Sequence, residues 1–175
     1  MQMIRAGGFV TALDRSPARM RVLKDNLARM NMQTNRVVAD VLEWQPSRAY
    51  DAVLLDAPCS ATGTWRRHPE VVHLASLEKI TQLAVLQREL LVRAWGWVKP
   101  GGKLVFCVCS LEPEEGEQQA AWFLAQQPDA KLSELPSTIP ADIMHDGNMR
   151  TLPSMRAGEG GMDGFFGAVF RLKKQ

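Results

Sequence analysis

The chain alternates between short apolar runs and longer stretches whose apolar residues have helical spacing. The short runs, typical of strands, cover residues 9–13, 36–39, 52–55, 103–109 and 164–172. The helical spacing is seen at Met20, Leu23, Leu27 and Met30, and again at Leu83, Leu86, Leu90, Leu91 and Ala94. Strands that alternate with helices predict an α/β fold, with a mostly parallel sheet and an antiparallel last strand.

Capping and turn residues predict where these elements begin and end. Ser16 is a good N-cap and Pro17 suits the first position of a helix. Glu114 and Glu115, just after a proline, are expected to open another helix, because carboxylates favour the positive end of the helix dipole. The other expectations are a helix end at Met1–Arg5, helical regions over about 69–98 and 113–127, a turn at Lys99–Gly102 and irregular structure over 128–163.

Three of the predicted strands are followed by a carboxylate, at Asp14, Asp40 and Asp56. The ends of parallel strands meet at one edge of a sheet, so these three acids are expected to line one groove. One carboxylate there suits the hydroxyls of a ribose, and another suits the amino group of an adenine. For Asp14, which lies beside Ser16, a helix cap is the competing interpretation.

Two cysteines follow the ends of strands, and the segment around them carries positive charge. Cys59 comes shortly after Asp56, whereas Cys109 ends the run 103–109. Cys107 falls inside that run, where a buried cysteine without a role is the ordinary case. The segment behind Cys59 is basic, with Arg66, Arg67 and His68. Cationic surroundings stabilise a thiolate, so this combination suggests nucleophilic catalysis on a nucleic-acid base.

Composition restricts the class of protein more than its function. The chain has 175 residues, of which 46% are hydrophobic, and a formal net charge of +2, too mild to indicate nucleic-acid binding by itself. One predicted helix and its entry carry a basic cluster: Arg15, Arg19, Arg21, Lys24 and Arg29. Three cysteines do not suggest a disulfide framework and favour a cytoplasmic protein with free thiols. The sequence shows no transmembrane stretch, signal-peptide pattern or Cys/His spacing for a metal.

Two long motifs resemble a known family. Asp56–Pro69 (DAPCSATGTWRRHP) resembles the fourth motif of the Sun (Fmu) family of RNA cytosine-5 methyltransferases, and Lys99–Glu117 (KPGGKLVFCVCSLEPEEGE) resembles its sixth. Shorter matches are Val10–Pro17 (VTALDRSP), Val38–Asp40 (VAD) and Met162–Phe166 (MDGFF). The resemblance covers nearly the whole chain, and it is closest to bacterial enzymes that methylate 16S ribosomal RNA.

The resemblance implies a Rossmann-like class I methyltransferase fold with S-adenosylmethionine as methyl donor. Asp14 matches the acid that binds the ribose, Asp40 the acid near the adenine, and Asp56 the acid that faces both cofactor and cytosine. Cys109 matches the nucleophile that adds to carbon 6 of a cytosine in ribosomal RNA. Cys59 matches the thiol that assists release of the product. The residues expected near the RNA are Arg66, Arg67 and His68.

The chain departs from the family's pattern in two places. Val108 stands where the family usually has Thr, which removes a hydroxyl beside Cys109. The family's first strand and its Gly-rich loop have no match, because Gly7–Gly8 and Gly101–Gly102 precede strands. Residues 1–175 are therefore interpreted as a partial, truncated catalytic domain without the family's N-terminal RNA-binding region. Without a central strand the sheet has unpaired edges, which we expect to be covered by rearrangement or by self-association with another chain.

Two other functions stay open. In a DNA cytosine-5 methyltransferase the Pro-Cys of the fourth motif supplies the nucleophile, which in this chain is Cys59. A non-catalytic RNA-binding module would keep both motifs as relics and would need neither thiol.

The unmatched Gly-rich loop predicts that this chain binds S-adenosylmethionine weakly or not at all, and the segment by itself is expected to be inactive. The reason is that this loop holds the methionine end of the cofactor in the family. Isothermal titration calorimetry measures the affinity directly, and a submillimolar dissociation constant would refute the prediction.

Overall fold

The computed structural model describes residues 7–174, which belong to two compact units, Met1–Ser47 and Arg48–Gln175. The helix end expected at Met1–Arg5 lies outside the described residues. Each unit has its own sheet. Among the described residues, no helix has both the length and the apolar character needed to cross a membrane.

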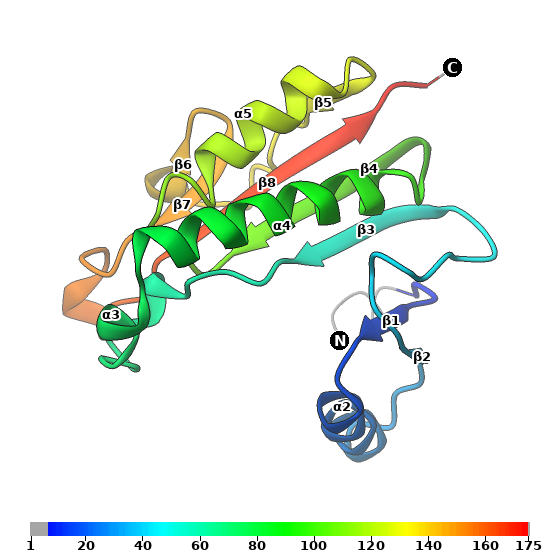
Figure 1. Cartoon of the computed structure of the whole chain (residues 1–175), viewed down its shortest axis with the longest axis horizontal. Coiled ribbons are helices and arrows are strands. Elements are labelled where there is room, and N and C mark those ends of the chain that lie inside the picture. The colour runs from blue at the N-terminus through cyan, green and yellow to red at the C-terminus, as the bar shows by residue number, and fades with distance from the viewer. Residues whose placement is uncertain (1–6, 175) are drawn as a thin grey trace. The chain divides into compact units, whose positions relative to one another are not determined.

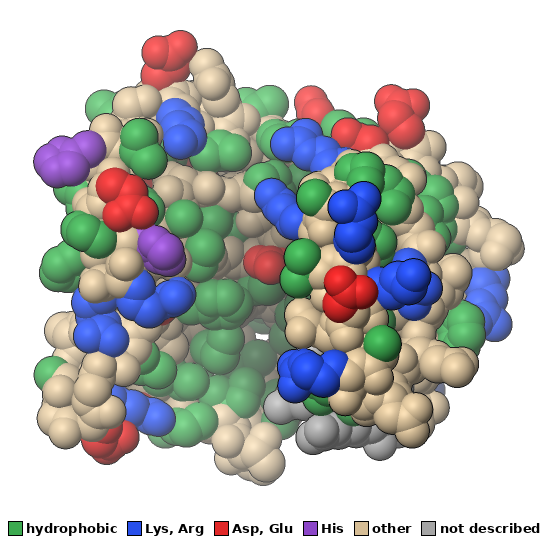
Figure 2. Space-filling view, turned by 90° about the horizontal axis from the view of Figure 1, so that it is seen from below, with side chains coloured by type: hydrophobic (Ala, Val, Ile, Leu, Met, Phe, Trp, Pro, Cys, Tyr) green, Lys and Arg blue, Asp and Glu red, His purple; other side chains and the backbone are tan. Residues whose placement is uncertain are grey.

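The smaller unit contains two parallel strands joined by a helix. Its elements are β1 (Thr11–Asp14), α2 (Pro17–Arg29) and β2 (Asn35–Val38). The expected N-cap is confirmed, because Ser16 Oγ accepts the N–H of Arg19 at 3.3 Å. Met20 and Leu27 are buried, as their helical spacing predicts, whereas the basic cluster at Arg15 and along α2 is exposed. Lys and Arg side chains accordingly gather over this unit in Figure 2.

The larger unit contains a mixed sheet with the strand order β3-β4-β8-β7-β6, and β5 also pairs with β8 (Figure 1). Its strands are β3 (Tyr50–Asp56), β4 (Val98–Val108), β5 (Ala130–Leu132), β6 (Met144–His145), β7 (Asn148–Thr151) and β8 (Phe165–Leu172). Its helices are α3 (Val71–Leu74), α4 (Leu77–Trp95) and α5 (Glu117–Gln126), with 3₁₀ turns at Thr62–Thr64, Ala141–Ile143 and Ala157–Glu159. β3 and β4 are parallel, whereas β8 is antiparallel to β4. The α/β class with an antiparallel last strand is confirmed, and β5, β6 and β7 add further antiparallel pairs.

The core of this unit lies between the sheet and the helices α4 and α5, which run along it (Figure 1). Leu55, Phe106 and Ala168 are aligned across β3, β4 and β8, and all three are buried. Phe123 of α5 is fully buried, and its ring centroid lies 4.6 Å from that of Phe170. This packing, rather than intrinsic strand or helix propensity, holds the sheet against the helices.

Several boundaries differ from the sequence-based expectations. Lys99–Gly102 is not a separate turn, because β4 already begins at Val98 and includes these residues as an irregularity opposite Asp51. The expected long helical region is interrupted before Ser76, whose hydroxyl caps α4. The helix expected from about residue 113 begins only at Glu117.

Each sheet ends in strands that have a single strand partner among residues 7–174. In the described part of the chain, β3 pairs only with β4, and β1 pairs only with β2. Unpaired edges were expected from the unmatched first strand. What covers these edges stays a prediction, and a continuous family-like sheet in a monomer measured by light scattering would contradict it.

We expect Phe123→Ala to lower the free energy of unfolding by about 3–5 kcal/mol, because it removes a buried ring that packs on two others. Leu77→Ala is the matched control, since Leu77 is 81% exposed and its loss should change stability by less than about 0.5 kcal/mol. Urea unfolding followed by circular dichroism measures both. Equal losses in the two variants would show that α5 does not carry the core.

Candidate active site

Two strands that run side by side deliver an acid and a thiol to the same end of the sheet. Asp56, the last residue of β3, is paired with Cys107 of β4, whose Sγ donates to Asp56 Oδ1 at 3.8 Å. Burial, and then the negative charge of Asp56, raise the pKa of Cys107 to about 12. Cys107 therefore stays protonated near neutral pH and is a poor nucleophile.

The segments after these strands form two loops that are hydrogen-bonded to one another. We call residues 57–64 the Cys59 loop and residues 109–116 the Cys109 loop. Gly63 donates its N–H to the carbonyl of Cys109 at 3.0 Å. Leu111 donates its N–H to Thr62 Oγ1, also at 3.0 Å. These bonds fix the Cys59 loop against the Cys109 loop.

The Cys59 loop also touches the start of β8 at a point where two glycines meet. Gly164 donates its N–H to the carbonyl of Gly63 at 2.8 Å. A Cβ on Gly63 would lie 2.1 Å from the carbonyl oxygen of Gly164, and a Cβ on Gly164 would lie 2.4 Å from Leu111 Cδ2. The two backbones can approach this closely only because neither residue has a side chain.

The thiols of Cys59 and Cys109 lie next to each other, with 3.6 Å between the sulfur atoms. The hydrogen bond from Cys59 lowers the pKa of Cys109 to about 7, although burial and the charges of Asp56 and Asp163 oppose this. The same hydrogen bond, followed by burial, raises the pKa of Cys59. Cys109 is therefore the thiol that ionises first, near neutral pH, while Cys59 keeps its proton, so the pair combines a nucleophile with a proton donor.

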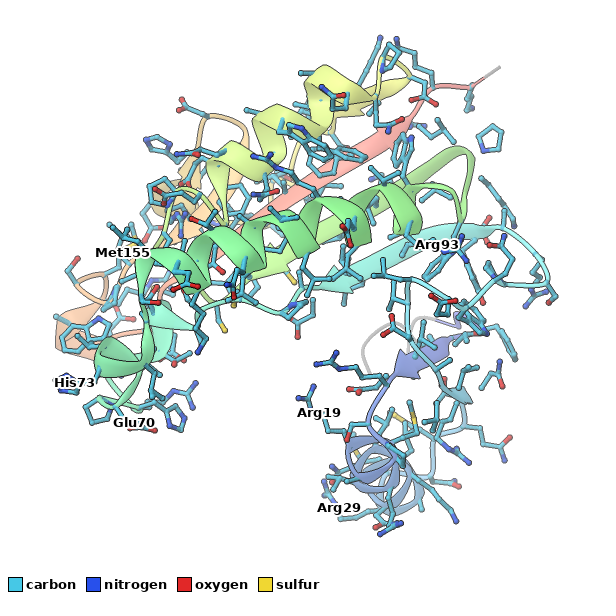
Figure 3. All side chains as sticks on the ribbon, viewed as in Figure 1. Arg19, Arg29, Glu70, His73, Arg93 and Met155 are labelled. Atoms are coloured by element: carbon cyan, nitrogen blue, oxygen red, sulfur yellow. The ribbon has the colours of Figure 1, made fainter. Side chains whose placement is uncertain are left out.

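The basic segment behind Cys59 is exposed, but two of its three residues already have protein partners. Arg67 Nε donates to both carboxylate oxygens of Asp163, at 3.1 and 2.9 Å, and this pairing lowers the pKa of Asp163. His68 Nδ1 lies 3.3 Å from Glu70 Oε1, and Figure 3 labels Glu70 just before α3. Arg67 thus ties this segment to the start of β8, a contact that the sequence did not predict. Contact of Arg66, Arg67 and His68 with RNA stays a prediction.

The other two predicted acids lie in the smaller unit, at the carboxyl ends of its parallel strands. Asp14 Oδ1 accepts the N–H of Ser16 at 2.7 Å, and its Oδ2 lies 3.5 Å from Nη1 of Arg19, which Figure 3 labels near the start of α2. The N-cap of α2 is Ser16 and not Asp14, so Asp14 holds the cap residue and the side chain of Arg19 and does not cap the helix itself. Asp40 is exposed, and its Oδ1 accepts the N–H of Leu42 at 2.9 Å. Carboxylates of this kind fit the hydroxyl and amino donors of a nucleoside, and a shared groove with Asp56 stays a prediction.

Sequence reasoning missed a buried polar cluster behind the two thiols. Glu115, expected in the first turn of a helix, is instead fully buried and accepts hydrogen bonds from Ser60 and Ser110. Arg150 of β7 donates to the carbonyl of Ser110 at 2.7 Å and is paired with Glu117. The one sign in the sequence is that a serine directly follows each of the two cysteines at strand ends.

Replacing Cys59 by Ala should raise the pKa of Cys109 from about 7 to its ordinary value of 9.0 or above, because the hydrogen bond that lowers it is lost. The rate of alkylation by iodoacetamide, followed at Cys109 by mass spectrometry across pH, reports the thiolate fraction. Cys107→Ala is the control and should leave the midpoint near 7. Identical midpoints in all three proteins would show that Cys59 does not hold the proton.

Comparison with known proteins identifies the family. Residues 1–171 match the family described as 16S rRNA methyltransferase RsmB/F. Ribosomal RNA small subunit methyltransferase B of Vibrio cholerae is 39% identical over 169 residues, which are 95% of this chain and 36% of that protein. The chain thus spans about a third of the length of this curated relative.

Solved structures agree with this assignment. The crystal structure of PH0851 has a TM-score of 0.83 and 36% identity, over 93% of this chain and 37% of that one. NSun6 from Pyrococcus horikoshii with SFG has a TM-score of 0.81 and 28% identity, over 96% of this chain and 42% of that one. The resemblance noted in the sequence is confirmed, and the chain belongs to the RsmB/F family of 16S rRNA methyltransferases.

Proposed function

We propose that these residues are the catalytic segment of a cytoplasmic enzyme that transfers a methyl group from S-adenosylmethionine to carbon 5 of a cytosine in 16S ribosomal RNA. The observation that carries the proposal is the pair of thiols 3.6 Å apart, with the proton on Cys59 and the thiolate on Cys109. The relatives' names support ribosomal RNA as the substrate, and the structure of NSun6 with SFG supports a nucleoside-type cofactor.

The methyl donor would be held through its nucleoside by carboxylates of the smaller unit. Asp14 would accept hydrogen bonds from the ribose hydroxyls, and Asp40 would accept one from the adenine amino group. When bound, the cofactor supplies an electrophilic methyl group on sulfur.

The thiolate of Cys109 is needed because carbon 5 of cytosine is a poor nucleophile. Cys109 Sγ forms a bond to carbon 6, and the electrons of the 5,6 double bond then make carbon 5 electron-rich enough to take the methyl group. Asp56, exposed at the end of β3, can stabilise this adduct through the ring nitrogen or the amino group of the base. The base must be splayed out of its stack to reach the thiol.

Cys59 acts when the product is released. A water molecule accepts the proton from carbon 5, the 5,6 double bond forms again, and the bond from carbon 6 to Cys109 breaks, so that sulfur departs as a thiolate. The hydrogen bond that Cys59 donates to Cys109 stabilises this leaving thiolate, as it does in the free pair. In the DNA-type alternative Cys59 is the nucleophile, but its raised pKa disfavours that role.

Trapping on RNA that contains 5-fluorocytosine tests the proposal, because fluorine cannot leave carbon 5 as the proton does and the covalent adduct persists. The test uses the longest natural chain that contains these residues, with S-adenosylmethionine. We expect an adduct with the unsubstituted protein, with Cys59→Ala and with the control Cys107→Ala, but none with Cys109→Ala.

The other outcomes favour the alternatives. Loss of the adduct in Cys59→Ala alone would favour the DNA-type mechanism. Absence of both adduct and methyl transfer in every protein would favour the non-catalytic RNA-binding module.

A further inference from the structure

Glu115 is a buried acid to which the proposed chemistry assigns no role. Its side chain is 0% exposed, although an isolated carboxylate is expensive to remove from water. It lies in the Cys109 loop, before the first residue of α5, and not within that helix. A carboxylate in such a position is retained only if its hydrogen-bond donors are well arranged.

The donors around Glu115 come from both cysteine loops. Ser60, which follows Cys59, donates its N–H to Glu115 Oε1 at 2.9 Å, and its hydroxyl donates to Oε2. Ser110, which follows Cys109, donates its hydroxyl to Oε2 at 2.6 Å. The two serine hydroxyls are themselves 3.1 Å apart. One carboxylate thus joins the residues directly behind the two thiols.

Gln87 of α4 supports the same assignment from a third element. Its Nε2 donates to Glu115 Oε1 at 3.1 Å and to the carbonyl of Pro58 at 2.9 Å. Its own Oε1 is buried and has no hydrogen-bond partner among residues 7–174. In this orientation the amide gives its donor group to the carboxylate and to the Pro58 carbonyl, and leaves its own oxygen without such a contact.

We propose that Glu115 is a positioning residue, which joins the Cys59 loop to the Cys109 loop and thereby sets the approach of the two sulfur atoms. Its charge also acts on the thiols: after the hydrogen bond to Cys109, burial and the charge of Cys109, the charge of Glu115 makes the smallest contribution to the raised pKa of Cys59. The catalytic meaning of this role rests on the proposed function. The effect of Glu115 on the distance between the two thiols does not depend on the proposed function.

The experiment measures the approach of the thiols without methyl transfer. Oxidised glutathione converts the two thiols into one disulfide and releases two molecules of reduced glutathione, at a rate that rises with their proximity. The measurement is made in a Cys107→Ala background, so that only Cys59 and Cys109 react, and mass spectrometry follows the product.

Glu115→Gln should slow closure of the Cys59–Cys109 disulfide by about tenfold or more, because its NH₂ group replaces one acceptor oxygen and opposes the donors of the serines. Glu114→Gln is the matched control, since Glu114 is the partly exposed neighbour in the same loop, and it should leave the rate unchanged. Ser110→Ala removes one donor without changing the charge and should slow closure by about threefold. It also provides the test if Glu115→Gln does not fold.

Urea unfolding separates positioning from a merely structural role. Lower stability with unchanged disulfide closure in Glu115→Gln and Ser110→Ala would overturn the proposal. Slower closure at a denaturant concentration where the variants are fully folded would support it. In a methyl-transfer assay on RNA with unmodified cytosine, the same variants of the longest natural chain should lower kcat with little change in KM for the RNA. Slow closure together with no adduct in any protein would leave the positioning role standing and would reject the proposed function instead.

Discussion

The parallel pairing of β3 with β4 determines where every reactive group of the larger unit lies. Leu55 is aligned with Phe106 and Asp56 with Cys107, so the first pair lies on the core face of the sheet and the second pair on the opposite face. A slip of one residue would reverse the faces of the strand, moving Leu55 out of the core. Because Phe106 is completely buried under the helices, the core locks the register, and the geometry of the thiols follows from it.

Local features were predictable because their causes are local. The N-cap at Ser16, the buried Met20 and Leu27, and the strands that end near Asp14 and Asp56 all follow from residues close together in the chain. The same holds for the two motifs, which place Cys59 and Cys109 after neighbouring parallel strands. The family, the α/β class and the antiparallel last strand could therefore be predicted without coordinates.

Other features depend on partners that are distant in sequence. β5 and β7 are short and lie in the region expected to be irregular, and both become strands by pairing with β8. The ion pair of Arg67 with Asp163 joins residues that are 96 positions apart. The position of Glu115 in the first turn of a helix was predicted from helix-dipole preferences alone. Its actual environment is created by Ser60 and Ser110, which are 55 and 5 positions away in the sequence. Burial of this kind leaves no periodic pattern that a sequence could show.

The meeting of Gly63 with Gly164 has a consequence for how this site can vary in evolution. The contact consists only of backbone, so hydropathy and charge give no sign of it, yet any added carbon collides with a carbonyl or with Leu111. Every missense change in a glycine codon adds at least one such atom. The neighbouring Trp65, which is 43% exposed, has room to change. Two of the positions with little freedom to mutate beside the thiols therefore have no side chain at all.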